Sequence, residues 1–71
     1  MLTTNADTDR AYLAKQRDRY QEFQANGQTS SALDALWRGA SAADLLTADE
    51  YRTSALTDAR ITTLLGKLGW I

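Results

Sequence analysis

The side chains best suited to acid–base chemistry in this 71-residue chain are its nine carboxylates. The candidates for acid–base pairs are Asp7, Asp9, Asp44, Asp49, Glu50 and Asp58. General acid or base catalysis needs a carboxylate that lies in a cleft and has a shifted pKa. Nearly every acid here instead lies at the start of a predicted helix, where capping and the helix dipole account for it. We therefore expect no enzyme and name no catalytic residue.

Other reaction chemistries lack the residues that they require. The chain contains no Cys and no His, which excludes disulfides, thiolate zinc sites, cysteine nucleophiles and imidazole bases. No Ser lies in a G-x-S-x-G motif, and Gly66-Lys67-Leu68-Gly69 has the wrong spacing for a phosphate-binding loop. We therefore predict no metal, no cofactor and no small-molecule substrate.

Charge and hydropathy limit the partners and the compartment. Eight basic residues against nine acidic ones give a net charge of −1, which argues against a nucleic-acid binder. No apolar run approaches the roughly 18 residues of a membrane-spanning helix. Residues 1–5 lack the basic and apolar regions of a secretory signal. We expect a soluble protein, intracellular or within an assembly or virion, that contacts no membrane.

The elements that position these residues are predicted to be helices. Twelve Ala and ten Leu, with no Val, favour an all-α fold. We predict a single helical domain over residues 1–71, with two longer helices at about 5–25 and 48–65. One or two short helices, at about 32–38 and 42–46, separate them. The two longer helices are expected to pair antiparallel.

Local signals give the expected ends of these helices. Thr4 with Asp7 has the form of a capping box, and Asn26-Gly27 is a typical stop. Three further box-like starts lie at Ser31, Ser41 and Thr47, while Gly39 and Gly66 are expected to end or bend a helix. The apolar positions of 48–65 drift around the axis. This segment is therefore either one helix contacted on two faces or two helices separated near 54–57.

Residues 31–50 resemble a helix-turn-helix in the spacing of Ala35, Gly39, Ser41 and Leu45. The helix that would read DNA, residues 42–50, holds three acids and no Lys or Arg. Phosphates would repel such a helix. An ordinary corner between two helices is the better interpretation, and DNA binding stays the weaker alternative.

The aromatic and apolar residues outside the regular core pattern are the predicted partner-binding residues. They are Tyr12, Tyr20, Phe23, Leu68, Trp70 and Ile71. Trp37 belongs to an i, i+3, i+4, i+7 stripe and is assigned to the core, whereas Gln16 interrupts the narrow apolar stripe of the first helix. Trp70-Ile71 has two alternatives: it folds back onto the core, or it inserts into a neighbouring subunit.

These observations favour a non-enzymatic protein that acts through protein–protein contacts, as a structural or accessory component of an oligomeric assembly. A chain this small has a marginal core and gains stability from association. In size and in its Ala-, Thr- and Gln-rich helical composition it resembles the accessory and connector proteins of phage particles, which implies a virion component. The alternative is a small regulator that occupies a basic cleft of a host enzyme or transcription factor through the acidic face Asp44/Asp49/Glu50.

Overall fold

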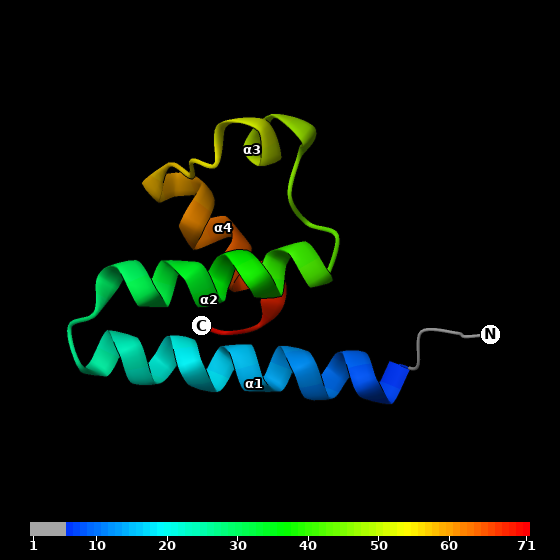
Figure 1. Cartoon of the computed structure of the whole chain (residues 1–71), viewed down its shortest axis with the longest axis vertical. Coiled ribbons are helices and arrows are strands. Elements are labelled where there is room, and N and C mark those ends of the chain that lie inside the picture. Colours follow the sequence, from blue (N-terminus) through cyan, green and yellow to red (C-terminus); the bar gives the residue numbers. More distant parts are fainter. Residues whose placement is uncertain (1–5) are drawn as a thin grey trace.

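The computed structural model describes residues 6–71, with side chains from residue 9 onward. These residues form four α-helices and no strand: α1 (Ala6–Ala25), α2 (Thr29–Ala42), α3 (Ala48–Thr53) and α4 (Asp58–Leu68). The predicted all-α fold is confirmed. Figure 1 shows α1 and α2 side by side and antiparallel, with α3 and α4 on the opposite side of α2 from α1.

The turn between α1 and α2 follows its local signal. α1 ends at Ala25, and Gly27 adopts a left-handed φ of +72° that lets the chain reverse within three residues. The amide of Gln28 donates to the Phe23 carbonyl at 2.8 Å, which satisfies one of the last carbonyls of the helix. The stop at Asn26-Gly27 is therefore confirmed, whereas the capping box proposed at Thr4 lies outside the described residues.

α2 is a single helix and is longer than predicted, because it replaces the one or two short helices expected at about 32–38 and 42–46. It runs through Gly39 and Ser41, and it begins after Gln28 rather than at Ser31. Gly39 is buried and faces the ring of Trp70, so the packing of this ring compensates for the low helix propensity of glycine. The expected corner of a helix-turn-helix is consequently absent, because Gly39 and Ser41 lie within one continuous helix.

The segment predicted as a helix over 48–65 is two helices, which decides between the two alternatives. Ser54 closes α3 in the left-handed conformation, at φ +54°. Thr57, which the sequence signals missed, caps α4 by accepting a hydrogen bond from the Arg60 amide at 3.2 Å. α4 continues through Gly66, and Gly69 at φ +75° terminates it instead. α1 and α2 are therefore the two long helices that pair.

The core lies between α2 and α4 and extends to one side of α1. Leu36 of α2 and Leu64 of α4 are its largest fully buried side chains. The small residues Ala32, Ala35 and Ala40 of α2 are also fully buried, or nearly so. The other buried apolar residues are Tyr20, Leu46, Leu65 and Trp70. No helix among the described residues has the length and apolar character needed to cross a bilayer.

α1 contributes less to this core than its length suggests. Among its described apolar side chains only Tyr20 is buried. Gln16, one turn earlier, is also buried, and its Oε1 has no hydrogen-bond partner. A buried acceptor without a partner opposes folding, because it loses its hydrogen bonds to water. α1 nevertheless packs lengthwise on α2 (Figure 1), and this is the most extensive helix–helix contact among the described residues.

Candidate functional site

The segment after α4 folds back onto the core. The amide of Gly69 donates to the Gly66 carbonyl at 3.1 Å, and that of Trp70 donates to Leu65 at 2.9 Å. Trp70 is 8% exposed, and its ring centroid lies 5.8 Å from that of Tyr20. Figure 1 shows this segment ending between α1 and α2. Of the two alternatives for Trp70, the structure shows the one in which it packs on its own core.

A groove of about 340 Å³ lies beside this tail, between the first half of α1 and the end of α4. It is lined by Arg10, Leu13, Ala14, Arg17, Leu68, Gly69 and Trp70. The apolar side chains are buried or half-buried, whereas both arginines are exposed. The result is an apolar floor with two arginines at its rim.

The α1 side of this groove continues as a stripe along the helix. We define the α1 stripe as residues that recur at three- and four-residue spacing and so share one face: they are Arg10, Ala14, Arg17, Gln21 and Gln24. No carboxylate belongs to it. Arg17 contacts Asp18 on the neighbouring face at 3.3 Å, and both side chains are largely exposed, so this ion pair is weak.

Three of the six predicted partner-binding residues lie at or beneath the groove. Leu68 and Trp70 line it, and Tyr20 is buried beneath Trp70. Ile71 follows directly and is 74% exposed. The arginines and Leu13 were missed, although their i, i+3, i+7 spacing places them on one side of α1.

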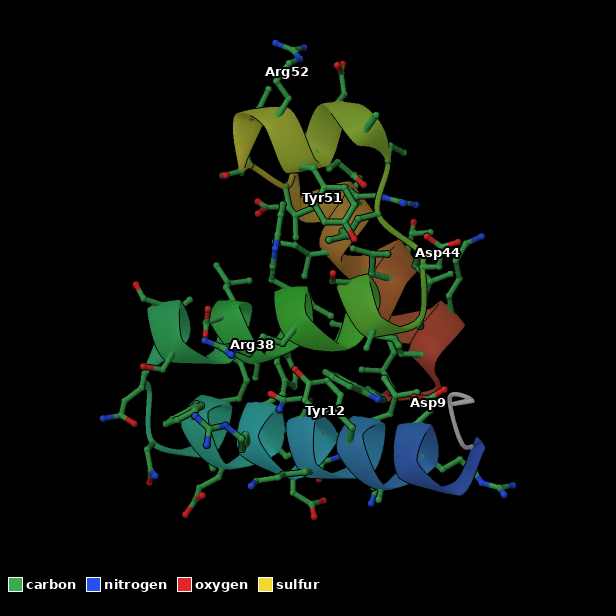
Figure 2. All side chains as sticks on the ribbon, turned by 45° about the vertical axis from the view of Figure 1, so that its right-hand side comes forward. Asp9, Tyr12, Arg38, Asp44, Tyr51 and Arg52 are labelled. Carbon is green, nitrogen blue, oxygen red and sulfur yellow. The ribbon has the colours of Figure 1, made fainter. Side chains whose placement is uncertain are left out.

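Tyr12 and Phe23 lie elsewhere on α1. Tyr12 is partly exposed and lies beside Arg38 of α2, as Figure 2 shows. A hydrogen bond from Arg38 to Asp34, at 2.9 Å, and the neighbouring Tyr12 raise the pKa of Arg38. Phe23 is half-buried beneath the guanidinium of Arg19, whose carbon lies 5.6 Å from the ring centroid. Neither residue lines the groove.

A second groove of about 350 Å³ separates α2 from the 54–57 turn and α4. Its apolar lining is Leu33, Trp37, Leu56 and Ile61. Trp37 is half-buried against the core, and Tyr51 packs edge-on against it with centroids 6.0 Å apart. The only charged lining residue is Asp34, which Arg38 already engages.

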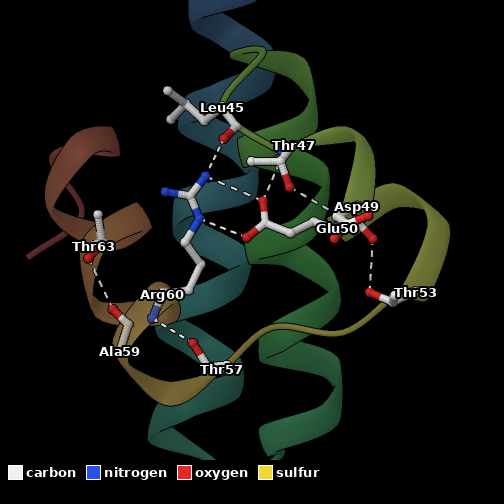
Figure 3. A network of polar contacts seen from close by, with 9 residues as sticks. All are labelled: Leu45, Thr47, Asp49, Glu50, Thr53, Thr57, Ala59, Arg60 and Thr63. Atoms are coloured by element: carbon white, nitrogen blue, oxygen red, sulfur yellow. Dashed lines mark hydrogen bonds and ion pairs between the residues drawn. The ribbon is translucent and has the colours of Figure 1, made fainter.

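The acidic face expected at Asp44/Asp49/Glu50 is partly used within the fold. Glu50 accepts from Arg60 Nε at 2.8 Å, and Arg60 also donates to the Leu45 carbonyl (Figure 3). The hydrogen bond from Arg60 and that from the Thr47 amide together lower the pKa of Glu50. Asp49 pairs with Arg52 at 2.6 Å. The contacts of Arg60 hold α3 and the segment after α2 against α4, whereas the Asp49–Arg52 pair lies within α3.

Among the described residues, no three His, Cys, Asp or Glu side chains are grouped closely enough to hold a metal ion. Neither a protein-family description, nor a curated protein, nor a solved structure significantly matches this chain.

Proposed function

We propose that this protein is a non-enzymatic protein-interaction module that serves as a structural or accessory component of an oligomeric assembly, such as a virion. The observation that supports it is the groove between α1 and the end of α4, where an apolar floor is bordered by two arginines. Interfaces combine a desolvated apolar centre with a polar rim and are enriched in Trp and Arg.

The energetics of the fold agree with this proposal. α1 is 20 residues long, yet Tyr20 is its one buried apolar side chain among residues 9–25, and Gln16 is buried without a partner for Oε1. Covering the groove would remove the remaining exposed area of the half-buried Leu13 and Leu68 from water, at roughly 25 cal/mol per Å². A partner that covers the groove would therefore add apolar burial to α1, whose described side chains contribute little to the core.

The test is site-specific photo-crosslinking of the full chain inside the cells or particles that contain it. The crosslinking amino acid replaces Ala14, which lies in the groove. The matched control places it at Ala11, which is exposed on α1 and does not line the groove. We expect position 14 to form an adduct with one protein, either a second copy or another chain. Equal adducts at both positions, or an adduct only with nucleic acid or lipid, would contradict the proposal.

A further inference from the structure

We propose that α3 is a lid on the end of α2, which closes by folding and opens by unfolding while α1, α2 and α4 stay folded. Opening removes the contact of α3 with Trp37, a residue that lines the second groove. The lid thereby controls how much apolar surface of Trp37 meets the solvent. It lies on a different face of the molecule from the groove beside Trp70, so its test does not depend on the proposed function.

α3 lacks the apolar burial that holds the other helices. None of its six residues is buried. In the described part of the chain, direct packing of helix on helix joins α1 to α2 and α2 to α4, and α3 takes part in neither contact. A helix of six residues is too short to be stable by itself in water. α3 is therefore folded only while its side chains are attached to the rest of the molecule.

Tyr51 makes the first closing contact. Its ring packs edge-on against Trp37 with centroids 6.0 Å apart, and its Oη lies 2.8 Å from Oγ of Ser41 in α2. Figure 2 shows Tyr51 pointing from α3 towards α2, whereas Arg52 points away from it. Tyr51 is nevertheless 46% exposed, so closing buries only part of this side chain.

The ion pair of Glu50 with Arg60 is the second closing contact. The carboxylate accepts from Arg60 Nε at 2.8 Å, and both side chains are half-buried (Figure 3). Arg60 also donates to the Leu45 carbonyl, a contact that does not involve α3 and can persist when the lid is open. The pair of Asp49 with Arg52 lies within α3 and does not attach it to another helix.

The chain is anchored on both sides of α3. Leu46 is buried in the core before α3, and Leu56 packs against the core after it. Between these anchors Ser54 adopts a left-handed φ of +54°, a conformation that residues with a Cβ avoid. Unfolding of α3 releases Ser54 from this conformation, while the two leucines confine the opening to the residues between them. A local opening therefore needs less free energy than unfolding of the whole chain.

Native-state hydrogen exchange of the full chain, followed by NMR, measures this opening. The amides of Tyr51 and Ser54 donate to carbonyls one turn earlier and report on α3, whereas those of Leu36 and Leu64 lie inside α2 and α4. We expect protection at the two α3 amides to be lower by at least about tenfold. Low urea should reduce protection at Leu36 and Leu64 only, because opening of α3 exposes little surface.

Substitutions test which contacts close the lid. Tyr51→Ala should lower protection of the Ser54 amide about tenfold, because the aromatic pair and the hydroxyl hydrogen bond are both lost. Arg52→Ala is the matched control, since this exposed α3 side chain pairs within its own helix. It should change that protection less than about twofold.

The double variant Glu50→Ala, Tyr51→Ala should hold the lid open. We expect its α3 amides to lose their protection while those of Leu36 and Leu64 keep theirs. A soluble paramagnetic probe should broaden the indole signal of Trp37 more in this variant than in the native chain. The signal of Trp70, which is buried by the tail, should be broadened equally in both.

Three results would overturn the lid. Equal protection of α3, Leu36 and Leu64, with the same dependence on urea, would show that α3 unfolds only with the rest of the chain. Complete unfolding of the double variant would lead to the same conclusion. Full protection of α3 in the double variant would show that Glu50 and Tyr51 are not what holds it closed.

Discussion

Replacing Gly39 by alanine tests whether the tail packs on α2. The added Cβ would lie 2.5 Å from Cη2 and 2.8 Å from Cζ2 of Trp70. These atoms cannot retreat freely, because the Trp70 ring packs on Tyr20 and its amide donates to Leu65. Gly66 offers a matched control, since it lies inside α4 with no atom within 4 Å of a Cβ placed there.

The two substitutions are expected to have opposite signs. Alanine in place of glycine inside a helix contributes about 1 kcal/mol of stability, so Gly66→Ala should stabilise the fold by up to that amount. Overpacking costs about 1–3 kcal/mol, so Gly39→Ala should destabilise it by up to about 2 kcal/mol after the helix gain of about 1 kcal/mol is subtracted. The two variants should therefore differ by the overpacking cost of about 1–3 kcal/mol, or by at least roughly 4 °C in Tm for a domain of this size.

Urea unfolding followed by far-UV circular dichroism measures these differences. The double variant Gly39→Ala, Trp70→Leu removes the clashing ring, so in the Trp70→Leu background the alanine should be neutral or stabilising. A Gly39→Ala variant as stable as Gly66→Ala would show that Trp70 does not occupy the space above α2, and the folded-back tail would be refuted.

Three further predictions concern polar groups. Gln16→Met should raise the free energy of unfolding by about 1–2 kcal/mol, because it removes the buried unpaired acceptor, and a lower urea midpoint would contradict this. Thr57→Ala should lower the free energy of unfolding by about 1 kcal/mol, because it removes the cap of α4. The control Thr62→Ala, at an exposed position inside α4, should leave this free energy nearly unchanged. Equal losses of stability in thermal unfolding of the two variants would contradict the capping role of Thr57. Arg60 and the Thr47 amide lower the pKa of Glu50 in the fold, so its stabilisation is present above the unfolded glutamate value of about 4.3 and is lost as the pH falls through the lower folded value. The stability difference between the native chain and Glu50→Gln should therefore shrink in acid, and a difference that does not change between pH 7 and pH 3 would refute this.

Signals that act within a few residues were readable from the sequence. The Asn26-Gly27 stop and the capping box of Thr47 and Glu50 lie where their residue types predict them. Capping and positive φ are local properties, since the groups involved lie within one helical turn of each other. Composition was equally informative, because an Ala- and Leu-rich chain without Val favours helices whatever its tertiary contacts.

The tertiary structure decided what depends on residues far apart in the chain. Gly39 continues a helix because Trp70, which lies 31 positions later, occupies the space that a side chain would fill. The groove likewise joins Arg10 and Arg17 of α1 to Leu68 at the end of α4. Helical periodicity places each residue on a face of its own helix but does not say which other helix that face meets. The sequence therefore predicted the helical class and several helix ends, whereas packing decided the course of α2, the position of Trp70 and the site.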